Sequence, residues 1–493
     1  MQNYKKIVGS ISIVTVSYLM SRILGFYREI MLANWTGLSE ATDILDLAFV
    51  IPDFLFYLSA GGYLAITLIP LLNKQKEDKI NDYFLSLLYG LTFIFILLTS
   101  VTYFLRYDIA DFLNVKNLDF FIEILTPIVF SQLFFFIGAI LMAFQYFKES
   151  FIFPALAPVI YNCSIIFFGW INSTSPEETV KGFAIGTLVG SILGHLIFQI
   201  FGVYKSGLLF KLLFPNFKYL KEYLFISLPL IVGQSIAVMD EQLFRYFGSL
   251  LETGSIASFR YARRIALLPV GIVAQAIGVA SYPFLSQLFN HKKFEELKIL
   301  VRKQLSYLVI LNGVLMIFGL VNSNSIIKLV YQRGSFTSIE SGIVSSIFFI
   351  ICFAILPWSI NQILSRTFYV QENFWFPVVS GTSVTLITIL YMTQIKNPTG
   401  LDFALVIVLS LYAYSIILLL KLNIDGEKLL DKGLIVDFIK SVLILSVSYF
   451  AAQAINLSNS IFSLLVSLIA ISLVVFVLLK LLKFKYINLT GRE

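Results

Sequence analysis

The sequence predicts an all-α integral membrane protein of about fourteen transmembrane helices, arranged as two six-helix lobes followed by two additional helices. Three observations predict this class: the composition, the distribution of basic residues and a repeated motif. The chain has 493 residues, of which 58% are hydrophobic and 13% are charged, and its mean hydropathy is +0.86. Because soluble domains carry roughly 25% charged residues, most of this chain is expected to face lipid.

The predicted spans are apolar and long enough to cross a hydrocarbon core of about 30 Å as helices. None shows the strict alternation of a barrel strand. The first span follows Lys5 and Lys6 but lacks a small-residue cleavage site, so it is expected to be retained. In chain order the spans are predicted near residues 8–33, 43–72, 83–105, 119–146, 151–171, 181–203, 221–247, 256–288, 303–321, 340–369, 374–394, 401–421, 434–453 and 459–480.

The basic residues between these spans predict the topology. With the N-terminus inside, the inner segments hold 22 Lys and Arg residues and the outer segments hold 6. Such a bias is typical of cytoplasmic loops, so both termini are expected in the cytoplasm. The net charge of +7 therefore reflects topology, and no nucleic-acid partner is predicted.

A nine-residue motif occurs twice and predicts the lobes. Residues 146–154 (Tyr-Phe-Lys-Glu-Ser-Phe-Ile-Phe-Pro) and 369–377 (Tyr-Val-Gln-Glu-Asn-Phe-Trp-Phe-Pro) share five positions. The copies are six predicted spans apart, so both lie on the inner face, as in a parallel repeat about an axis along the membrane normal. Two such lobes are the usual architecture of a transporter. The predicted divisions are a first lobe at 1–215, a second at 216–430 and the additional helices at 431–493.

Arg22, Arg28 and Glu29 lie inside the first predicted span. An ionised side chain at the centre of a span costs roughly 2.5–3.5 kcal/mol on insertion scales, so it must face water, protein or a ligand. Arg22 and Glu29 are seven residues apart and share a helix face. Glu29 is therefore open to two interpretations: a member of an internal ion pair with one Arg, or part of a ligand site with both.

Arg260, Arg263 and Arg264 open the eighth predicted span. This is the outer half of the membrane, where topology does not require positive charge. One interpretation is a cationic patch that binds substrate, and the alternative is an interfacial cluster that binds lipid phosphate. Arg is the natural partner of phosphate because its planar fork makes bidentate, charge-assisted bonds, so the arginines together predict an anionic substrate.

Acidic residues and a histidine also fall within predicted spans. Asp43 is expected either to cap its own helix or to accompany the arginines. Asp53 lies deep in a span and should have a partner, and Asp240 is a candidate ion-pair partner of Arg245. His195 is expected to be a hydrogen-bonded core residue.

No catalytic or cofactor signature is evident. The sequence contains no phosphate-binding Gly loop, nucleophile elbow, metal-ligand spacing or paired catalytic carboxylates. Cys163 and Cys352 are isolated and give no disulfide framework. A protein that is not an enzyme, with no metal and no cofactor, is predicted.

Four groups of residues form a recognisable set of motifs: Ser21–Glu29 with Ala41–Asp43, Gly254–Ala257 with Arg264, Arg333–Thr337 and Arg366–Tyr369. They resemble motifs of the MurJ (MviN) lipid II flippases, which belong to the superfamily that also holds MATE exporters and O-antigen flippases. The resemblance implies alternating-access transport of a polyprenyl-diphosphate-linked peptidoglycan precursor from the inner to the outer leaflet of the bacterial cytoplasmic membrane.

The resemblance also implies site residues and partners. It places Arg22, Arg28, Asp43 and Arg264 in a central cavity between the lobes, and Arg260 and Glu29 are added from their positions. Membrane lipids and envelope-synthesis proteins are the implied partners.

One departure from the family keeps alternative functions open. The second span of the family commonly has an Arg pair where this chain has Phe56 and Tyr57. A flippase for another undecaprenyl-linked oligosaccharide is therefore the first alternative. A cation-coupled small-molecule exporter is the second, although it would need an acidic cavity. A scaffold in an envelope-assembly complex would need no inward-facing Arg.

Overall fold

The computed structural model describes residues 2–59, 63–237, 239–453 and 461–487. Within these ranges, the side chains of residues 2–15, 18, 57–59, 63, 65–66, 229–237 and 239–240 are outside the description. The side chains of Tyr57 and Asp240 are therefore not placed. The chain divides into two compact units. Unit 1 comprises Met1–Ala257 and Arg333–Phe336, and unit 2 comprises Ser258–Gln332 and Thr337–Glu493.

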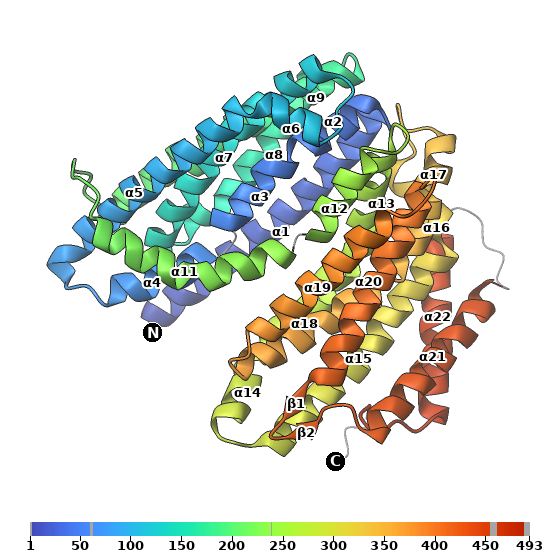
Figure 1. Cartoon of the computed structure of the whole chain (residues 1–493). Coiled ribbons are helices and arrows are strands. Elements are labelled where there is room, and N and C mark those ends of the chain that lie inside the picture. Colours follow the sequence, from blue (N-terminus) through green and yellow to red (C-terminus); the bar gives the residue numbers. More distant parts are fainter. Residues whose placement is uncertain (1, 60–62, 238, 454–460, 488–493) are drawn as a thin grey trace. The chain divides into compact units, whose positions relative to one another are not determined.

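Unit 1 is helical. In it α7 lies beside α5, α4 and α9, and α1 packs against α8 (Figure 1). Its elements are α1 (Gln2–Thr36), α2 (Glu40–Ala48), α3 (Val50–Ser59), α4 (Tyr63–Asn73), α5 (Glu77–Phe104), α6 (Arg106–Phe112), α7 (Leu118–Phe147), α8 (Ile152–Ile171), α9 (Pro176–Gly190), the π-helical turn η1 (Ser191–Ile197), α10 (Phe198–Lys205), α11 (Phe217–Ala237) and α12 (Met239–Gly248).

Unit 2 is organised around α15, which packs against α14, α17, α18, α21 and α22. Its first helix, α13 (Ser255–Pro269), begins in the last three residues of unit 1. The other elements are η2 (Val270–Ala274), α14 (Gln275–Asn290), α15 (Phe294–Val321), α16 (Ser323–Tyr331), α17 (Ser338–Cys352), α18 (Ile355–Val370), α19 (Trp375–Met392), α20 (Gly400–Lys421), β1 (Asn423–Ile424), β2 (Glu427–Lys428), α21 (Lys432–Gln453) and α22 (Ile461–Leu481).

The all-α membrane architecture is confirmed. Apart from the two-residue strands β1 and β2, which pair as a small hairpin, the regular structure of the described residues is helical. Eleven helical stretches in this part of the chain are long and apolar enough to cross a membrane. They coincide with the third to sixth and the eighth to fourteenth predicted spans. The other three predicted spans include residues outside the description, so the total of fourteen stays a prediction.

Proline determines where several helices begin. Pro52, Pro154, Pro357 and Pro377 each occupy the third residue of a helix, in α3, α8, α18 and α19. Proline has no amide hydrogen, and the amides of the first helical turn have no intrahelical acceptor, so a proline there costs no helical hydrogen bond. The second predicted span therefore begins as two helices, α2 and α3, instead of the single helix expected over 43–72.

The two copies of the nine-residue motif fold into the same turn. Glu149 and Glu372 both adopt a left-handed backbone conformation, with φ of 55° and 58°. Their amides donate to the carbonyls of Tyr146 and Tyr369 at 3.1 and 3.0 Å. This geometry is a helix C-terminal cap. The repeat therefore extends to local structure, while the superposition of residues 1–215 on 216–430 stays a prediction.

A stripe of glycines brings α8 and α9 into close contact. Gly182, Gly186, Gly190 and Gly194 recur every fourth residue, and each faces α8. A Cβ atom on Gly186 would lie 2.7 Å from the Cα atom of Ile165, which is too close for any side chain. Small residues at this spacing let membrane helices approach closely. The sequence carries this signal plainly, although it did not enter the predictions above.

Candidate substrate-binding site

Arg28 is held inside unit 1 by one acid and one amide. Its Nη2 atom is 3.0 Å from Oε1 of Glu29, and its Nη1 atom donates to Oδ1 of Asn162 on α8 at 3.2 Å. The Glu29 side chain is 3% exposed and that of Arg28 is 21% exposed. Glu29 therefore forms the internal ion pair that the sequence left open, and its partner is the adjacent Arg28. Asn162 was missed, although an isolated amide in an apolar span is a recognisable signal.

Arg22 lies on the same helix, α1, with an exposed side chain. Gly25 lies between the two arginines and faces Asn162, because a Cβ atom there would be 3.9 Å from the amide atoms of Asn162. That distance is an ordinary van der Waals contact, so Gly25 is not required by steric crowding. Arg22 and Arg28 thus share a helix but differ in burial.

Asp43 caps a helix other than its own. Ser39 caps α2 by accepting a hydrogen bond from the amide of Thr42. The two carboxylate oxygens of Asp43 accept from the amides of Gly254 and Ala257, at 2.6 and 2.8 Å. These amides belong to the first turn of α13, where a carboxylate offsets the positive end of the helix dipole. Asp43 therefore anchors the start of the helix that carries Arg260 and Arg264.

Asp53, for which the sequence predicts an unspecified partner, pairs with Arg245 on α12. Nη1 of Arg245 is 3.0 Å from Oδ2 of Asp53, and Nη2 is 2.9 Å from Oε1 of Glu241. The Arg245 side chain is 10% exposed. One Arg thus contacts two acids. The expected pairing of Asp240 with Arg245 falls on a side chain outside the description.

The arginines of α13 belong to unit 2 and contact aromatic rings. The Cζ atom of Arg260 lies 4.7 Å from the ring centroid of Tyr261, and that of Arg263 lies 5.6 Å from the ring centroid of Trp358. Arg264 is exposed. Cation–π contacts occupy the face of a guanidinium and leave its edges able to donate hydrogen bonds.

His195 is a buried residue of η1. Its ring packs against Phe135 at 4.1 Å and Tyr161 at 5.9 Å between centroids. Among the described residues, nothing accepts from or donates to its Nδ1 atom. His195 therefore occupies a core position, as predicted. The predicted hydrogen bond is not observed at its Nδ1 atom within the described residues. In the same part of the chain, no group of three or more His, Cys, Asp or Glu side chains is arranged to hold a metal ion.

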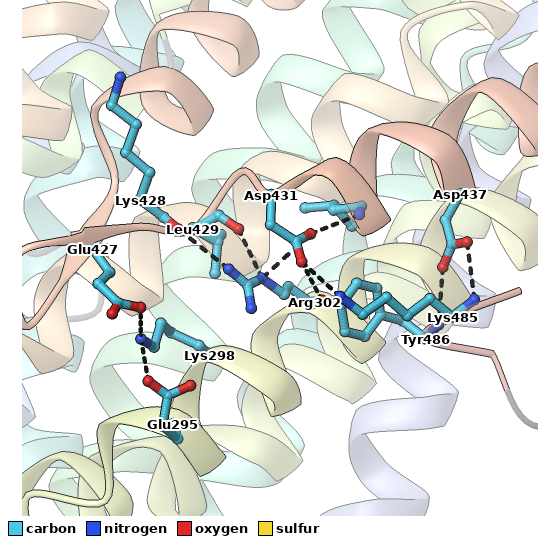
Figure 2. A network of polar contacts seen from close by, with 11 residues as sticks. Glu295, Lys298, Arg302, Glu427, Lys428, Leu429, Asp431, Asp437, Lys485 and Tyr486 are labelled. Carbon is cyan, nitrogen blue, oxygen red and sulfur yellow. Dashed lines mark hydrogen bonds and ion pairs between the residues drawn. The ribbon is translucent and has the colours of Figure 1, made fainter.

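A second charged cluster lies in unit 2 around the β1–β2 hairpin, and Figure 2 shows how its members connect α15, the hairpin, α21 and the chain after α22. We call it the hairpin network. Lys298 is buried and pairs with Glu295 and Glu427. Arg302 donates to the carbonyls of Leu429 and Lys428 at 2.8 and 3.2 Å. The network comprises Glu295, Lys298, Arg302, Glu427, Lys428, Leu429, Asp431, Asp437, Lys485 and Tyr486.

Two aspartates attach the C-terminal segment to this network. Asp437 accepts from the amides of Lys485 and Tyr486 at 3.0 and 2.9 Å. Asp431 accepts from the Lys485 ammonium and the Tyr486 hydroxyl at 2.9 and 2.6 Å. Burial alone would raise the pKa of Asp431, but hydrogen bonds from Tyr486, the Leu434 amide and Lys485 outweigh it and lower this pKa to about 2. The network thus fixes α21 and α22 to α15.

These features define a multi-pass α-helical membrane protein with buried arginines and a transporter-type architecture. The fold is similar to that of solved MOP-superfamily transporters. An inward-facing multidrug resistance MATE family transporter aligns with a TM-score of 0.65 and 13% identity, covering 89% of this chain and 98% of the other. A structure described as lipid II flippase MurJ, inward closed conformation, aligns with a TM-score of 0.79 and 24% identity, covering 95% and 98%.

The family follows from the sequence match. Residues 32–476 match the family model described as lipid II flippase MurJ, so the chain belongs to that family. A probable lipid II flippase MurJ of Buchnera aphidicola subsp. Acyrthosiphon pisum is 29% identical over 416 residues, which cover 80% of this chain and 78% of the relative. The lipid II flippase MurJ of Thermosipho africanus is 24% identical over 397 residues, covering 78% and 79%.

Proposed function

We propose that this protein translocates lipid II, the polyprenyl-diphosphate-linked peptidoglycan precursor, from the inner to the outer leaflet of the bacterial cytoplasmic membrane. The observation that carries the proposal is the match of residues 32–476 to the lipid II flippase family. Translocation by alternating access changes the position of the substrate and breaks no covalent bond. The protein therefore acts as a transporter and not as an enzyme, with no metal or cofactor.

The proposed diphosphate ligands are Arg22, Arg28, Arg260 and Arg264. Arg28 supports the role best, because its guanidinium is partly buried and bonds one acid and one neutral amide. A diphosphate offers two anionic groups to such a fork. Glu29 is proposed to orient Arg28 between substrate molecules. Asp43 is proposed to act indirectly, by anchoring the first turn of α13.

The same proposal places both termini in the cytoplasm. Labelling of single cysteines tests it, and the structure guides the choice of sites. Lys298 is buried, and Ser175 caps α9, so both are poor positions. Thr174 and Lys428 are exposed. We expect T174C to react with an impermeant reagent from outside and K428C to react only after permeabilisation. The reverse pattern would contradict the topology.

Complementation tests the substrate. We expect the gene to restore growth of a bacterium depleted of its own lipid II flippase, and to leave an O-antigen flippase mutant uncorrected. Restoration of O-antigen export alone would establish the alternative substrate. Failure in both strains, with the protein present in the membrane at normal abundance, would count against flipping of either glycan.

A further inference from the structure

A loop in unit 1 presents large apolar side chains to the outside. Residues 208–216 connect α10 to α11 without regular secondary structure, and we call them the 208–216 loop. Leu212 is 99% exposed and Phe214 is 98% exposed, whereas Leu208 is fully buried. In an extended segment, residues two apart point to the same side, so Leu212 and Phe214 form one outward apolar pair. The start of α11 adds Phe217, which is 76% exposed.

This conformation is anchored to α5 by four hydrogen bonds. The Asn81 amide group donates to the carbonyl of Leu209 at 2.7 Å and accepts from its amide at 3.1 Å. The Tyr89 hydroxyl donates to the carbonyl of Lys211 at 3.1 Å. The amide of Asn216 donates to Oγ of Ser86 at 2.6 Å. These bonds fix the backbone of the loop to α5, so the exposed side chains of Leu212 and Phe214 belong to an anchored segment.

The position and charge of the loop indicate what covers this apolar pair. The candidate membrane span Pro176–Lys205 ends three residues before the loop begins, so the loop lies where a helix leaves the bilayer. Residues 205–222 contain four Lys and one Glu. Lys211 pairs with Asp82 at 2.5 Å, which leaves Lys205, Lys218 and Lys221 as the basic excess. Apolar side chains interleaved with Lys at a membrane surface are typical of interfacial anchors.

We propose that the 208–216 loop is an interfacial anchor. Leu212 and Phe214 insert at the boundary between headgroups and acyl chains, and Lys218 and Lys221 bind anionic lipid headgroups. The anchor holds unit 1 at a fixed depth at the membrane surface, independently of the substrate site. The occupant is the lipid surface; a second copy of the chain and a partner protein are the alternatives that the test separates.

A fluorescent label at the apolar tip tests the anchor directly. In a background with Cys163→Ser and Cys352→Ala, the variant L212C is labelled with an environment-sensitive dye and placed in phosphatidylcholine nanodiscs, with and without phosphatidylglycerol. We expect a blue-shifted emission that a spin-labelled lipid quenches. K428C, exposed on the β1–β2 hairpin, is the matched control and should show the emission of a water-exposed dye. Equal, unquenched emission at both sites would overturn the anchor.

The headgroup part of the proposal has its own variants. K218Q and K221Q should each reduce phosphatidylglycerol retention roughly fivefold in native mass spectrometry of mixed-lipid nanodiscs, with the thermal unfolding midpoint unchanged. Retention equal to that of the unsubstituted protein would refute the anionic-lipid site. A blue shift that appears in detergent only as protein concentration rises would assign the loop to a contact between copies. A blue shift that needs an added soluble protein would assign it to a partner. Either result overturns the membrane anchor.

Discussion

Arg28 is partly buried and Arg245 is buried, both within unit 1, and the two differ in the number of carboxylates that they contact. Arg245 bonds two carboxylates, from Asp53 and Glu241, with one terminal nitrogen on each. Arg28 bonds the carboxylate of Glu29 and the neutral amide of Asn162. Arg245 also donates to Oε1 of Gln242 at 3.5 Å, so both arginines have an uncharged acceptor, and the difference is the number of carboxylates, two at Arg245 and one at Arg28.

The difference shows how burial alone fails to identify a ligand-binding arginine. Both side chains are well enough buried to need partners. A guanidinium between two acids is a structural link, because a phosphate would have to compete with a carboxylate for either terminal nitrogen. A guanidinium with an amide partner can exchange that bond for a charge-assisted bond to phosphate, which is roughly twice as strong. The comparison therefore supports the proposal that Arg28 binds substrate, whereas Arg245 is expected to have a structural role.

Removal of Arg245 should produce the largest effect on stability. R245A removes the cation shared by the carboxylates of Asp53 and Glu241, which are partly exposed, so the cost should be below the value of about 3–5 kcal/mol for a fully buried pair. The thermal unfolding midpoint of purified protein should fall strongly, and the triple variant with D53N and E241Q should recover most of the loss. An unchanged unfolding midpoint for R245A would show that Arg245 has no structural role, and the contrast with Arg28 would then be wrong.

Exchange of each arginine for lysine sharpens the comparison. Lysine keeps the charge but lacks the fork that reaches two acceptors. R28K should leave the unfolding midpoint nearly unchanged while lipid II translocation falls roughly 10- to 100-fold, because about 1.4–2.8 kcal/mol of bidentate binding is lost. R245K should instead lower the midpoint. A translocation assay in proteoliposomes and thermal unfolding on the same preparations give both readouts. Equal losses of both quantities in the two variants would erase the distinction.

Loss of the Asn162 side chain should give a smaller effect. N162L removes the neutral acceptor of Arg28 and leaves the ion pair with Glu29 intact. Asn162 orients Arg28 only until phosphate replaces it, so we expect translocation to fall by less than in R28K, at most roughly tenfold. N172L removes an amide at the end of α8 that bonds only the carbonyl of Phe168 at 2.8 Å, and it serves as the control. A larger transport defect in N172L than in N162L would contradict the role of Asn162.

The hairpin network lies outside the predicted membrane spans, and its Asp431 already bonds Lys485 and Tyr486. We expect changes there to have the smallest effect on stability. The pKa of Asp431 is lowered to about 2, below its unfolded value, so its contribution is present above about pH 4 and is lost as the pH falls toward 2. The pKa of Lys485 is raised by its hydrogen bond to Asp431, so that contribution persists below pH 10.5 and is lost at still higher pH. Because water screens both groups, the effect on stability should be smaller than that of R245A.

Hydrogen exchange measures this attachment. The amides of Lys485 and Tyr486 should exchange slowly near neutral pH and faster, after correction for intrinsic rates, at pH 3. D431N should bring the fast exchange to neutral pH, while E296Q, in a surface pair with Lys293, should not. Protection that is independent of Asp431 would show that Asp437 alone holds the segment.

The sequence predicted the class and most of the helices because hydropathy and the positions of basic residues act locally. The repeated motif predicted two related lobes, and the turn with a left-handed Glu that its two copies share was found only in the structure. The partners of the charges could not be predicted in the same way. Asp43 bonds amides more than 200 residues away, and Arg245 lies 192 residues from Asp53. Such pairings depend on tertiary packing, which a single sequence does not specify. The glycine stripe facing α8 and the isolated Asn162 were readable signals of that packing.

Native mass spectrometry of lipid II binding tests the central claim most directly. Purified protein, R28K and R245K would be compared at equal lipid II concentration, with a prenyl-linked glycan of a different sugar composition as competitor. The account predicts that the unsubstituted protein and folded R245K retain lipid II in preference to the competitor, and that R28K retains at least about tenfold less. Retention by R28K equal to that of the unsubstituted protein would contradict the assignment of Arg28 as a diphosphate ligand.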